Sequence, residues 1–267
     1  MELQLEGKRA LVTGSSMGIG ERIAHSFAEE GAAVVVTAIE ADLCEQVASS
    51  IRDKGGRAWA ISGDIGNDED VERIVGEARA QAGGVDVLVN NAGILTPGEW
   101  LDVTPEAWSH LHNVNVLGAV RLIRAIVPGM KEAGWGRVVN ISSTEAIQPF
   151  PFFPHYAATK AAIVNMTVSL AHALDRTGIT VNTVTPGVIH TKGVEDWYRQ
   201  VAQQFGWGDD WSVIEPNVLK TFLDNPVGRF GKVEEVADVV TFLASPRSGY
   251  VNGVNIRIDG GSTLSVN

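Results

Sequence analysis

Seven short apolar runs alternate with longer segments of helical periodicity along this chain of 267 residues. The runs are mostly rich in valine and isoleucine and nearly continuous, which is typical of strands buried on both faces of a sheet. Strand–helix–strand repetition predicts right-handed crossovers, and therefore an α/β fold with a doubly wound, mainly parallel seven-stranded sheet and helices on both faces. The expected strands span residues 8–13, 33–38, 57–62, 85–90, 137–142, 180–185 and 254–258, and the expected helices span 20–30, 42–54, 68–82, 116–132, 156–176 and 233–244.

One segment, residues 191–227, interrupts this alternation because it contains no expected strand. A structureless loop of that length would be unusual in a compact domain, so we interpret the segment as a mobile helical cover. The sequence shows no internal repeat and no low-complexity linker, which indicates a single domain over residues 1–267. The aromatic residues of the segment are Trp197, Tyr198, Phe205, Trp207, Trp211 and Phe222.

The charge balance and the residue types exclude several classes of function. The formal net charge is −11 and no Lys/Arg-rich run is present, so neither nucleic-acid binding nor docking on an anionic membrane is expected. The longest apolar runs are strand-sized and too short to span a bilayer. Cys44 is the single cysteine and cannot form an intrachain disulfide; with no recognisable secretory segment, a reducing cytoplasm is the expected compartment. The six histidines form no His-Glu-x-x-His motif, so no metal is expected.

Three glycines, Gly14, Gly18 and Gly20, follow the first expected strand at the point where the first helix begins. Gly14 permits a tight turn, Gly18 lets the backbone approach a pyrophosphate, and Gly20 lets the helix pack close to the sheet. The N–H groups and positive dipole end of the helix then suit phosphate. The spacing differs from the common Gly-x-Gly-x-x-Gly fingerprint, and a glycine-rich turn without a ligand is the alternative. The position at the first strand–helix turn of an alternating chain favours a dinucleotide site.

Several motifs in chain order together carry a family resemblance. They read Thr13-Gly14-x-x-x-Gly18-Ile19-Gly20, Asn90-Asn91-Ala92-Gly93, Tyr156-x-x-x-Lys160 and Pro186-Gly187, followed by Arg229-Phe230-Gly231 and Ile258-Asp259-Gly260-Gly261. Each motif is weak alone, but the set covers essentially the whole chain and resembles the short-chain dehydrogenase/reductase family. The resemblance implies one NAD(P)-binding domain of the Rossmann type, with residues 191–227 as a substrate-binding lid. It also implies hydride transfer between a nicotinamide and a secondary alcohol or ketone.

Tyr156 and Lys160 are four residues apart on an expected helix, which places them on one face, one turn apart. An oxidoreductase of alcohols needs an acid/base beside the reacting oxygen. A free phenol has a pKa of about 10, and a nearby ammonium favours the phenolate and lowers that value. The spacing therefore predicts that Lys160 adjusts the acidity of Tyr156. An ordinary exposed Tyr–Lys pair on an amphipathic helix is the alternative.

The resemblance implies two further catalytic residues, a serine and an asparagine. The family places its serine thirteen residues before the tyrosine, which selects Ser143 rather than Ser142. Ser143 would orient the substrate oxygen at the carboxyl end of a strand, where open α/β sheets bind ligands, while Ser142 would be structural. Asn115 resembles the helix asparagine whose backbone holds a water linked to the lysine. Asn113 is its rival, and the Val-x-Gly sequence that follows favours Asn115.

The resemblance also implies which residues hold the cofactor, and NAD is the expected form. Ala38 occupies the position of the usual NAD-selecting aspartate, but neither Met17 nor Ile39 is basic, and Glu40 would repel a 2′-phosphate. For Asp64, the alternative to an adenine contact is a loop residue that caps the next helix. The expected contacts are Gly14, Ser16, Met17, Gly18, Ile19, Gly20, Ala38, Asp64, Ile65, Asn91, Ala92, Gly93, Tyr156, Lys160, Pro186, Gly187, Val188 and Thr191.

The expected substrate-binding residues are Ser143, Glu145, Phe153 and Tyr156. Phe150, Phe152 and Phe153 are expected to join the aromatic residues of the lid in a pocket for a hydrophobic or ring-containing substrate. Packing of those aromatic residues within the lid is the alternative. Glu145 stands where relatives commonly have a small residue, and it would either repel an anionic substrate or bond a substrate hydroxyl.

Two other functions compete with this interpretation. One is a dinucleotide-binding regulator without catalysis, against which the complete serine, tyrosine and lysine set argues. The other is a 3-oxoacyl-thioester reductase within the same family. By analogy with the family, the partner of the chain is a small-molecule alcohol or ketone and the assembly is a homo-tetramer.

Overall fold

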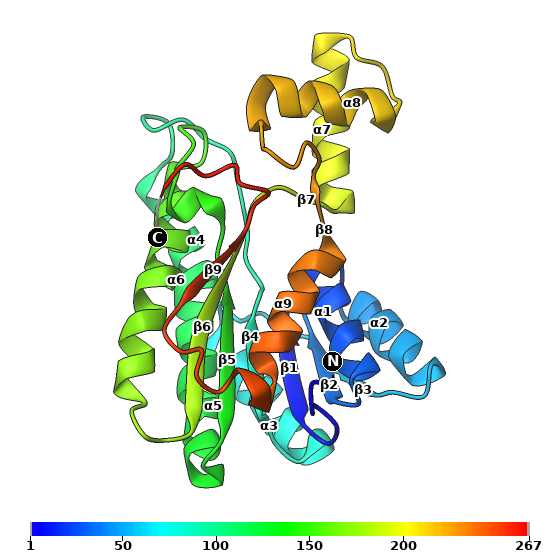
Figure 1. The fold of residues 1–267 in the computed structure, drawn as a ribbon. Helices are drawn as coiled ribbons and strands as arrows, with labels where there is room; N and C mark the ends of the chain where they lie inside the picture. The colour runs from blue at the N-terminus through cyan, green and yellow to red at the C-terminus, as the bar shows by residue number, and fades with distance from the viewer. Residues whose placement is uncertain (1, 266–267) are drawn as a thin grey trace.

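Seven parallel strands form one sheet in the computed structural model, which describes residues 2–265 of the chain (Figure 1). Their order across the sheet is β3-β2-β1-β4-β5-β6-β9. Each of the seven overlaps an expected strand, so the doubly wound, Rossmann-type α/β fold is confirmed. The strands are β1 (Arg9–Thr13), β2 (Ala33–Thr37), β3 (Arg57–Ala60), β4 (Val87–Asn90), β5 (Gly136–Ile141), β6 (Ile179–Pro186) and β9 (Asn255–Ile258).

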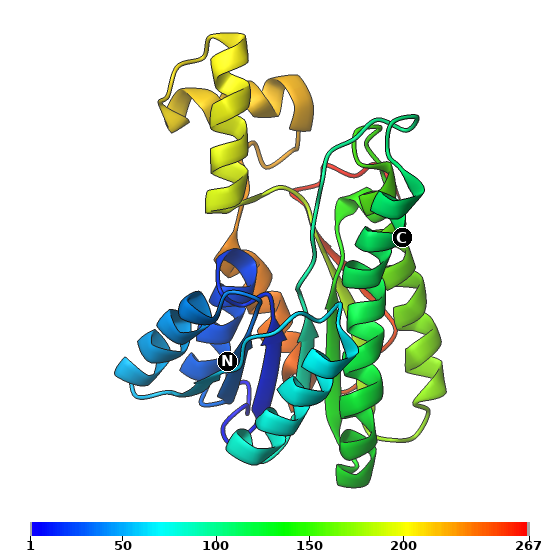
Figure 2. The same cartoon turned by 180° about the vertical axis from the view of Figure 1, so that it is seen from behind.

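Helices cover both faces of the sheet, as the two opposite views show (Figures 1 and 2). Successive strand residues face opposite sides, so Val12 belongs to one hydrophobic core and Leu11 to the other. The continuous apolar runs of the sequence therefore serve two cores at once. One face is covered by α1 (Gly18–Glu29), α2 (Ala41–Asp53) and α9 (Val233–Ala244), and the other by α3 (Asp68–Ala82), α5 (Gly118–Ala133) and α6 (Pro154–Ala173).

The strand order reverses direction at the neighbouring strands β1 and β4. Strands β2 and β3 lie in sequence order on one side of β1. The chain then returns to place β4 on the other side of β1, and β5, β6 and β9 follow beyond it. The crevice beyond the carboxyl ends of the strands at such a reversal is the usual ligand site of an open α/β sheet. Thr13 and Asn90 end β1 and β4 at this crevice.

A π-helical turn joins two helices on the α5 face. Helix α4 (Pro105–His112) runs into η1 (Asn113–Leu117), and α5 follows directly. The expected helix start at residue 116 therefore falls inside this turn. Single π-turns within helices are rare and frequently lie at functional sites. Asn115 is at the middle of this one.

Residues 191–227 are largely helical, as expected, and Figure 1 shows them standing above the sheet. They contain α7 (Lys192–Phe205), α8 (Trp211–Val218) and the π-helical η3 (Leu219–Leu223). A parallel pair of two-residue strands, β7 (Ile189–His190) and β8 (Gly231–Lys232), connects this segment to the body and was not foreseen. Four of its residues, Ala202, Ile214, Val218 and Leu219, form a small core together with Phe230, which follows the segment.

Two 3₁₀ turns complete the elements, η2 (Thr144–Ala146) after β5 and η4 (Pro246–Ser248) after α9. No helix in residues 2–265 is both long enough and apolar enough to cross a membrane. Within the same residues, His, Cys, Asp and Glu side chains form no group of three or more that could hold a metal ion.

Candidate active site

Two glycines of the loop between β1 and α1, Gly14 and Gly20, are packed so closely that a Cβ atom does not fit. Gly14 and Gly18 have φ angles of 61° and 60°, in the left-handed region that favours glycine. A Cβ atom on Gly14 would lie 2.9 Å from the Cα atom of Ala92, and one on Gly20 would lie 2.2 Å from the carbonyl oxygen of Gly14. A Cβ on Gly18 would come 3.4 Å from the Thr191 methyl group. The three glycines thus form a narrow cradle at the turn between β1 and α1.

The N-terminus of α1 opens into this cradle. Its N-cap residue, Met17, makes no side-chain hydrogen bond to the first turn, whereas Thr191 caps α7 through a bond from the Val194 N–H. The first turn of α1 therefore has no side-chain acceptor from its own cap, and its N–H groups suit a phosphate. Ser16 is nearly buried in the loop, and the Ile19 side chain packs against the core.

The segment after β4 is tied to the glycine loop by hydrogen bonds. The Thr13 hydroxyl accepts bonds of 2.9 Å from the backbone N–H groups of both Asn91 and Ala92. The Asn91 amide donates in return to the carbonyl oxygens of Thr13 and Gly14 at 2.9 and 3.0 Å. These bonds fix the two loops at the sheet reversal, where the expected cofactor residues Gly14, Asn91 and Ala92 meet.

Tyr156 and Ser143 face one another across the end of β5. Tyr156 lies in the first turn of α6, and Ser143 is the N-cap of the 3₁₀ turn η2. The Ser143 hydroxyl lies close enough to the Tyr156 phenol to lower the pKa of Tyr156, because it favours the ionised form. Ser142 is different, because it is buried and its hydroxyl donates to the Lys160 carbonyl oxygen at 2.9 Å. The structure thus places Ser143 toward Tyr156 and gives Ser142 a backbone contact.

Lys160 is buried beneath Tyr156, with only 5% of its surface exposed. Its ammonium nitrogen donates to the Ile141 carbonyl oxygen at 3.0 Å and lies 5.5 Å from the centroid of the Tyr156 ring. Burial lowers the pKa of Lys160 to about 8, because desolvation disfavours the charged form. At pH 7 the group is still mostly an ammonium.

The pKa of Tyr156 differs from the sequence-based expectation. The pKa of Tyr156 is raised to about 12, mainly by burial; the Ser143 hydroxyl lowers it and the negative charge of Glu145 raises it. Lys160 is not among the groups that shift it, so the expected lowering by Lys160 is not found in the protein alone. In this state Tyr156 is a neutral acid that can donate a proton.

Asn115 and Lys160 approach the same point from different helices. A Cβ atom on Gly93 would lie 3.3 Å from the Asn115 side-chain oxygen and 3.4 Å from the Lys160 ammonium nitrogen. The Asn115 amide exchanges two hydrogen bonds with the Ile94 backbone, of 2.8 and 2.9 Å. Asn113 points elsewhere, since it donates to the Gly66 carbonyl and accepts from Arg121. The geometry separates the two candidates and places Asn115 beside the lysine.

A buried chain of amides and hydroxyls beneath this site was missed by sequence reasoning. Asn90 donates to Asn140 at 2.8 Å, Asn140 donates to Thr167 at 2.8 Å, and Thr183 donates to Thr167 at 2.7 Å. These hydrogen bonds connect β4, β5, β6 and α6. Their signal in the sequence was an asparagine inside two otherwise apolar strands. Buried hydrogen bonds of this kind fix the relative position of the elements that carry them.

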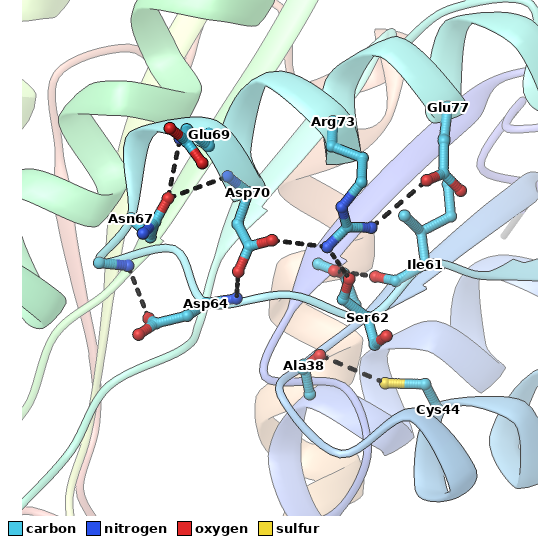
Figure 3. A network of polar contacts seen from close by, with 12 residues as sticks. Ala38, Cys44, Ile61, Ser62, Asp64, Asn67, Glu69, Asp70, Arg73 and Glu77 are labelled. Atoms are coloured by element: carbon cyan, nitrogen blue, oxygen red, sulfur yellow. Dashed lines mark hydrogen bonds and ion pairs between the residues drawn. The ribbon is translucent and has the colours of Figure 1, made fainter.

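The end of β2 and the loop after β3 lie side by side (Figure 3). The Ala38 carbonyl accepts a bond of 2.8 Å from the Gly63 N–H. Asp64 accepts from the Gly66 N–H at 2.7 Å, and it is Asn67 rather than Asp64 that caps α3. Met17 and Ile39 are 56% and 65% exposed, so two apolar side chains remain open to solvent where the adenosine of a cofactor was expected. Ile65 is buried against α5.

The chain after β6 borders the cradle on its other side. Pro186 ends β6, and the Gly187 N–H donates to the Ile258 carbonyl oxygen at 2.9 Å. Thr191 approaches Gly18, as described above, and Val188 lines a neighbouring cavity. The four residues expected near a nicotinamide, Pro186, Gly187, Val188 and Thr191, thus lie between the glycine loop and the lid.

A cavity of about 630 Å³ extends from the turn after Ser143 toward the lid and the C-terminal loop. Glu145 and Phe150 line one side, and Val188 and Phe222 are among the apolar residues of the other sides. Phe153, an expected substrate contact, does not line this cavity but is the N-cap of α6. The remaining lining residues are Thr144, Gln148, Leu219, Leu223, Asp224, Asn225, Val227, Arg229, Gly231, Glu235, Arg257, Ile258, Asp259, Gly260, Gly261, Ser262 and Thr263.

The aromatic residues of the lid mostly contact one another. Tyr198 and Trp211 both pack edge-on against Phe230 at 5.7 Å between ring centroids, and Phe205 contacts Trp207 at 4.9 Å. These contacts agree with the alternative interpretation, in which the aromatic residues of the segment 191–227 pack with one another instead of lining a substrate pocket. Phe150 and Phe222 are the aromatic residues that line the cavity.

Three comparisons with known proteins agree with this arrangement. Residues 8–202 match the family model described as short chain dehydrogenase. The chain is 37% identical to an uncharacterized oxidoreductase of Bacillus subtilis, YvaG, and the match covers 100% of both chains. It is 34% identical to the 3-oxoacyl-[acyl-carrier-protein] reductase FabG of Vibrio cholerae, over 97% of this chain and 98% of that protein.

A solved structure resembles the whole molecule. The L-sorbose reductase of Gluconobacter frateurii, complexed with NADPH and L-sorbose, superimposes with a TM-score of 0.95. The two chains share 34% sequence identity, and the match covers 100% of each.

Proposed function

Because this chain belongs to the short-chain dehydrogenase/reductase family and is an oxidoreductase acting on CH–OH groups, we propose that Ser143, Tyr156, Lys160 and Asn115 act on a secondary alcohol or its ketone. The observation that carries the proposal is the grouping of Ser143 and Tyr156 beside the buried Lys160 ammonium, which lies 5.5 Å from the Tyr156 ring centroid, next to a cavity. A neutral phenol and a hydroxyl at one point suit a carbonyl oxygen that must be held and protonated.

The residues of the cradle fit a nicotinamide dinucleotide. The loop leaves no room for a Cβ atom at Gly14 or Gly20, and the Met17 side chain does not cap the N-terminus of α1. Gly14, Gly18 and Gly20 would hold the pyrophosphate, and Val188 and Thr191 would border the nicotinamide. When bound, the cofactor supplies or accepts the hydride.

The proton is handled by the chain itself. In reduction, Ser143 holds the substrate oxygen and Tyr156 donates its phenolic proton to that oxygen. In oxidation, the Tyr156 phenolate takes the proton of the substrate hydroxyl. The positive charge of Lys160 favours the Tyr156 phenolate. Together with Asn115, Lys160 lies on a path by which the proton that Tyr156 donates can be replaced. Residues Ser16, Ile19, Asp64, Ile65 and Gly93 complete the proposed cofactor contacts.

We propose that the choice between NAD and NADP is set at Ala38. The expected preference for NAD rests on Met17 and Ile39, which are not basic, and on the acidic Glu40. The NADPH bound by the sorbose reductase does not support that preference. Ala38 has neither the carboxylate that would bond a ribose hydroxyl nor a bulk that would exclude a phosphate.

Replacing Ala38 by aspartate is expected to weaken NADPH binding by at least about tenfold relative to NADH, because the new carboxylate repels a 2′-phosphate and accepts a bond from a 2′-hydroxyl. Fluorescence titration of both reduced cofactors measures this ratio. Ala38→Asn, which has nearly the same shape without the charge, is the matched control. A ratio that does not move in Ala38→Asp would show that the 2′-group lies elsewhere.

The substrate that we propose is hydrophobic in part or contains a ring. The apolar lining of the cavity by Phe150, Val188 and Phe222 supports this, with residues 191–227 as the substrate-binding lid. The alternative within the family is a 3-oxoacyl-thioester reductase, which the likeness to FabG favours. A cytoplasmic homo-tetramer stays an expectation, carried by the family resemblance and the single cysteine.

The test of the function is a titration with NADH and NADPH, followed by reduction of cyclohexanone, acetone and an acetoacetyl thioester with the preferred cofactor. We expect turnover of cyclohexanone at a higher kcat/KM than that of acetone, because the apolar cavity walls contact the ring. A higher kcat/KM for the thioester would favour the alternative function. Cofactor binding without turnover of any ketone would favour a non-catalytic regulator.

A further inference from the structure

Glu145 is a carboxylate at the boundary between the catalytic residues and the cavity. It lies two residues after Ser143, and its backbone N–H donates to the Ser143 hydroxyl at 3.2 Å. Its side chain lines the cavity together with Phe150. A residue in this position is close to any group attached beside the carbon atom that reacts.

One oxygen of this carboxylate is already engaged. Oε2 accepts a bond of 2.7 Å from the Phe150 N–H, which fixes the orientation of the side chain. Oε1 accepts no hydrogen bond among the described residues, although a carboxylate oxygen has room for two. Because Glu145 lines the cavity, its Oε1 atom is available to a group bound there.

No cation of residues 2–265 forms a salt bridge with this carboxylate, and burial raises the pKa of Glu145. The negative charge of Glu145 raises the pKa of two phenols, those of Tyr156 and of Tyr198 in α7. The arginines of the cavity are engaged elsewhere: Arg229 pairs with Glu235 at 2.6 Å, and Arg257 donates to the Ser265 carbonyl. A partly buried carboxylate without a cation is stabilised by hydrogen bonds from neutral donors.

We propose that Glu145 is a specificity-determining residue, and that Oε1 accepts a hydrogen bond from a hydroxyl on the carbon next to the reacting carbon. This inference rests on the proposed function. It makes the substrate a vicinal diol or the corresponding α-hydroxy ketone, and it disfavours a substrate with a carboxylate at that position. The hydroxyl donates to the free oxygen, while the ring or chain of the substrate contacts Phe150 and Phe222.

The experiment compares oxidation of trans-cyclohexane-1,2-diol with that of cyclohexanol, which differs by the one hydroxyl. We expect the wild-type chain to prefer the diol by about 10- to 100-fold in kcat/KM, the range of a hydrogen bond to a charged group. Glu145→Gln keeps an oxygen for the Phe150 N–H but removes the charge. It is expected to lose most of the preference by lowering kcat/KM for the diol. Any change in the acidity of Tyr156 affects both alcohols, so it leaves the ratio unchanged.

Glu132→Gln, at an exposed glutamate near the end of α5, is the matched control and is expected to keep the preference. Cofactor titration and a melting curve establish that each variant is folded. If cyclohexanol is oxidised and the diol is no better, or if Glu145→Gln slows both alcohols equally, the role of Glu145 is wrong while the proposed function stands. If neither alcohol is oxidised with either cofactor, the proposed function itself is wrong.

Discussion

Replacing Tyr156 by phenylalanine is expected to lower kcat by about 100- to 10,000-fold, the usual contribution of a positioned acid/base. The ring remains and still fills its place in the first turn of α6, so the fold and the cofactor cradle are retained. Only the phenolic hydroxyl and its interaction with Ser143 are lost. Steady-state rates with a ketone measure the first effect, and fluorescence titration with the reduced cofactor measures the second.

The chain offers a matched control in Tyr250, whose side chain is fully exposed. Tyr250→Phe removes the same atom from a position far from the Ser143 contact, and its kcat is expected to equal that of the wild type. A Tyr156→Phe variant that still turns over at the wild-type rate would contradict the assignment of the acid. A variant that loses cofactor affinity together with turnover would show a structural role for the hydroxyl instead.

The sheet could be predicted almost completely from the sequence, because its strands are buried on both faces. A strand such as β2, Ala33–Thr37, is buried at every position. Each of its residues must therefore be apolar or form its hydrogen bonds within the protein, and the apolar run in the sequence is continuous. The order of the strands follows once the crossovers are taken to be right-handed and the first strand–helix turn is placed at the reversal.

The elements that were missed depend on contacts between distant parts of the chain. Strands β7 and β8 have two residues each and pair across some forty intervening positions, so no local period marks them. The π-turn at Asn113–Leu117 interrupts a sequence that reads as one helix. Helix α6 ends at Ala173, before the expected helix end at residue 176, and Leu174 then packs into the core.

The family resemblance selected the candidate site residues, but it did not give their chemistry. It chose Ser143 by its interval to Tyr156, and in the structure the Ser142 hydroxyl donates to the α6 backbone. The pKa of Tyr156 could not be predicted in the same way. It depends on how much solvent the fold excludes and on the charge of Glu145, and neither quantity appears in the spacing of the Tyr–Lys pair.

Replacing Gly20 by alanine is expected to abolish cofactor binding and to lower the free energy of unfolding by about 1–3 kcal/mol, the usual cost of overpacking. The new Cβ atom would lie 2.2 Å from the Gly14 carbonyl oxygen and 2.5 Å from the Asn91 amide nitrogen. The first of these is a backbone atom, so the glycine loop must move, and the bonds that join it to Asn91 are strained with it. Cofactor fluorescence and a melting curve measure the two effects.

Gly76 provides the opposite case, because it is a glycine inside helix α3 with no atom within 4 Å of an added Cβ. Gly76→Ala is expected to stabilise the chain by about 0.5–1 kcal/mol, since alanine loses less conformational freedom in a helix, and to leave cofactor binding unchanged. The two substitutions add the same methyl group to a helix, so their difference isolates the contact with the glycine loop. Normal cofactor affinity in Gly20→Ala would mean that the loop can open without losing its ligand, and the cradle would then not be the binding site.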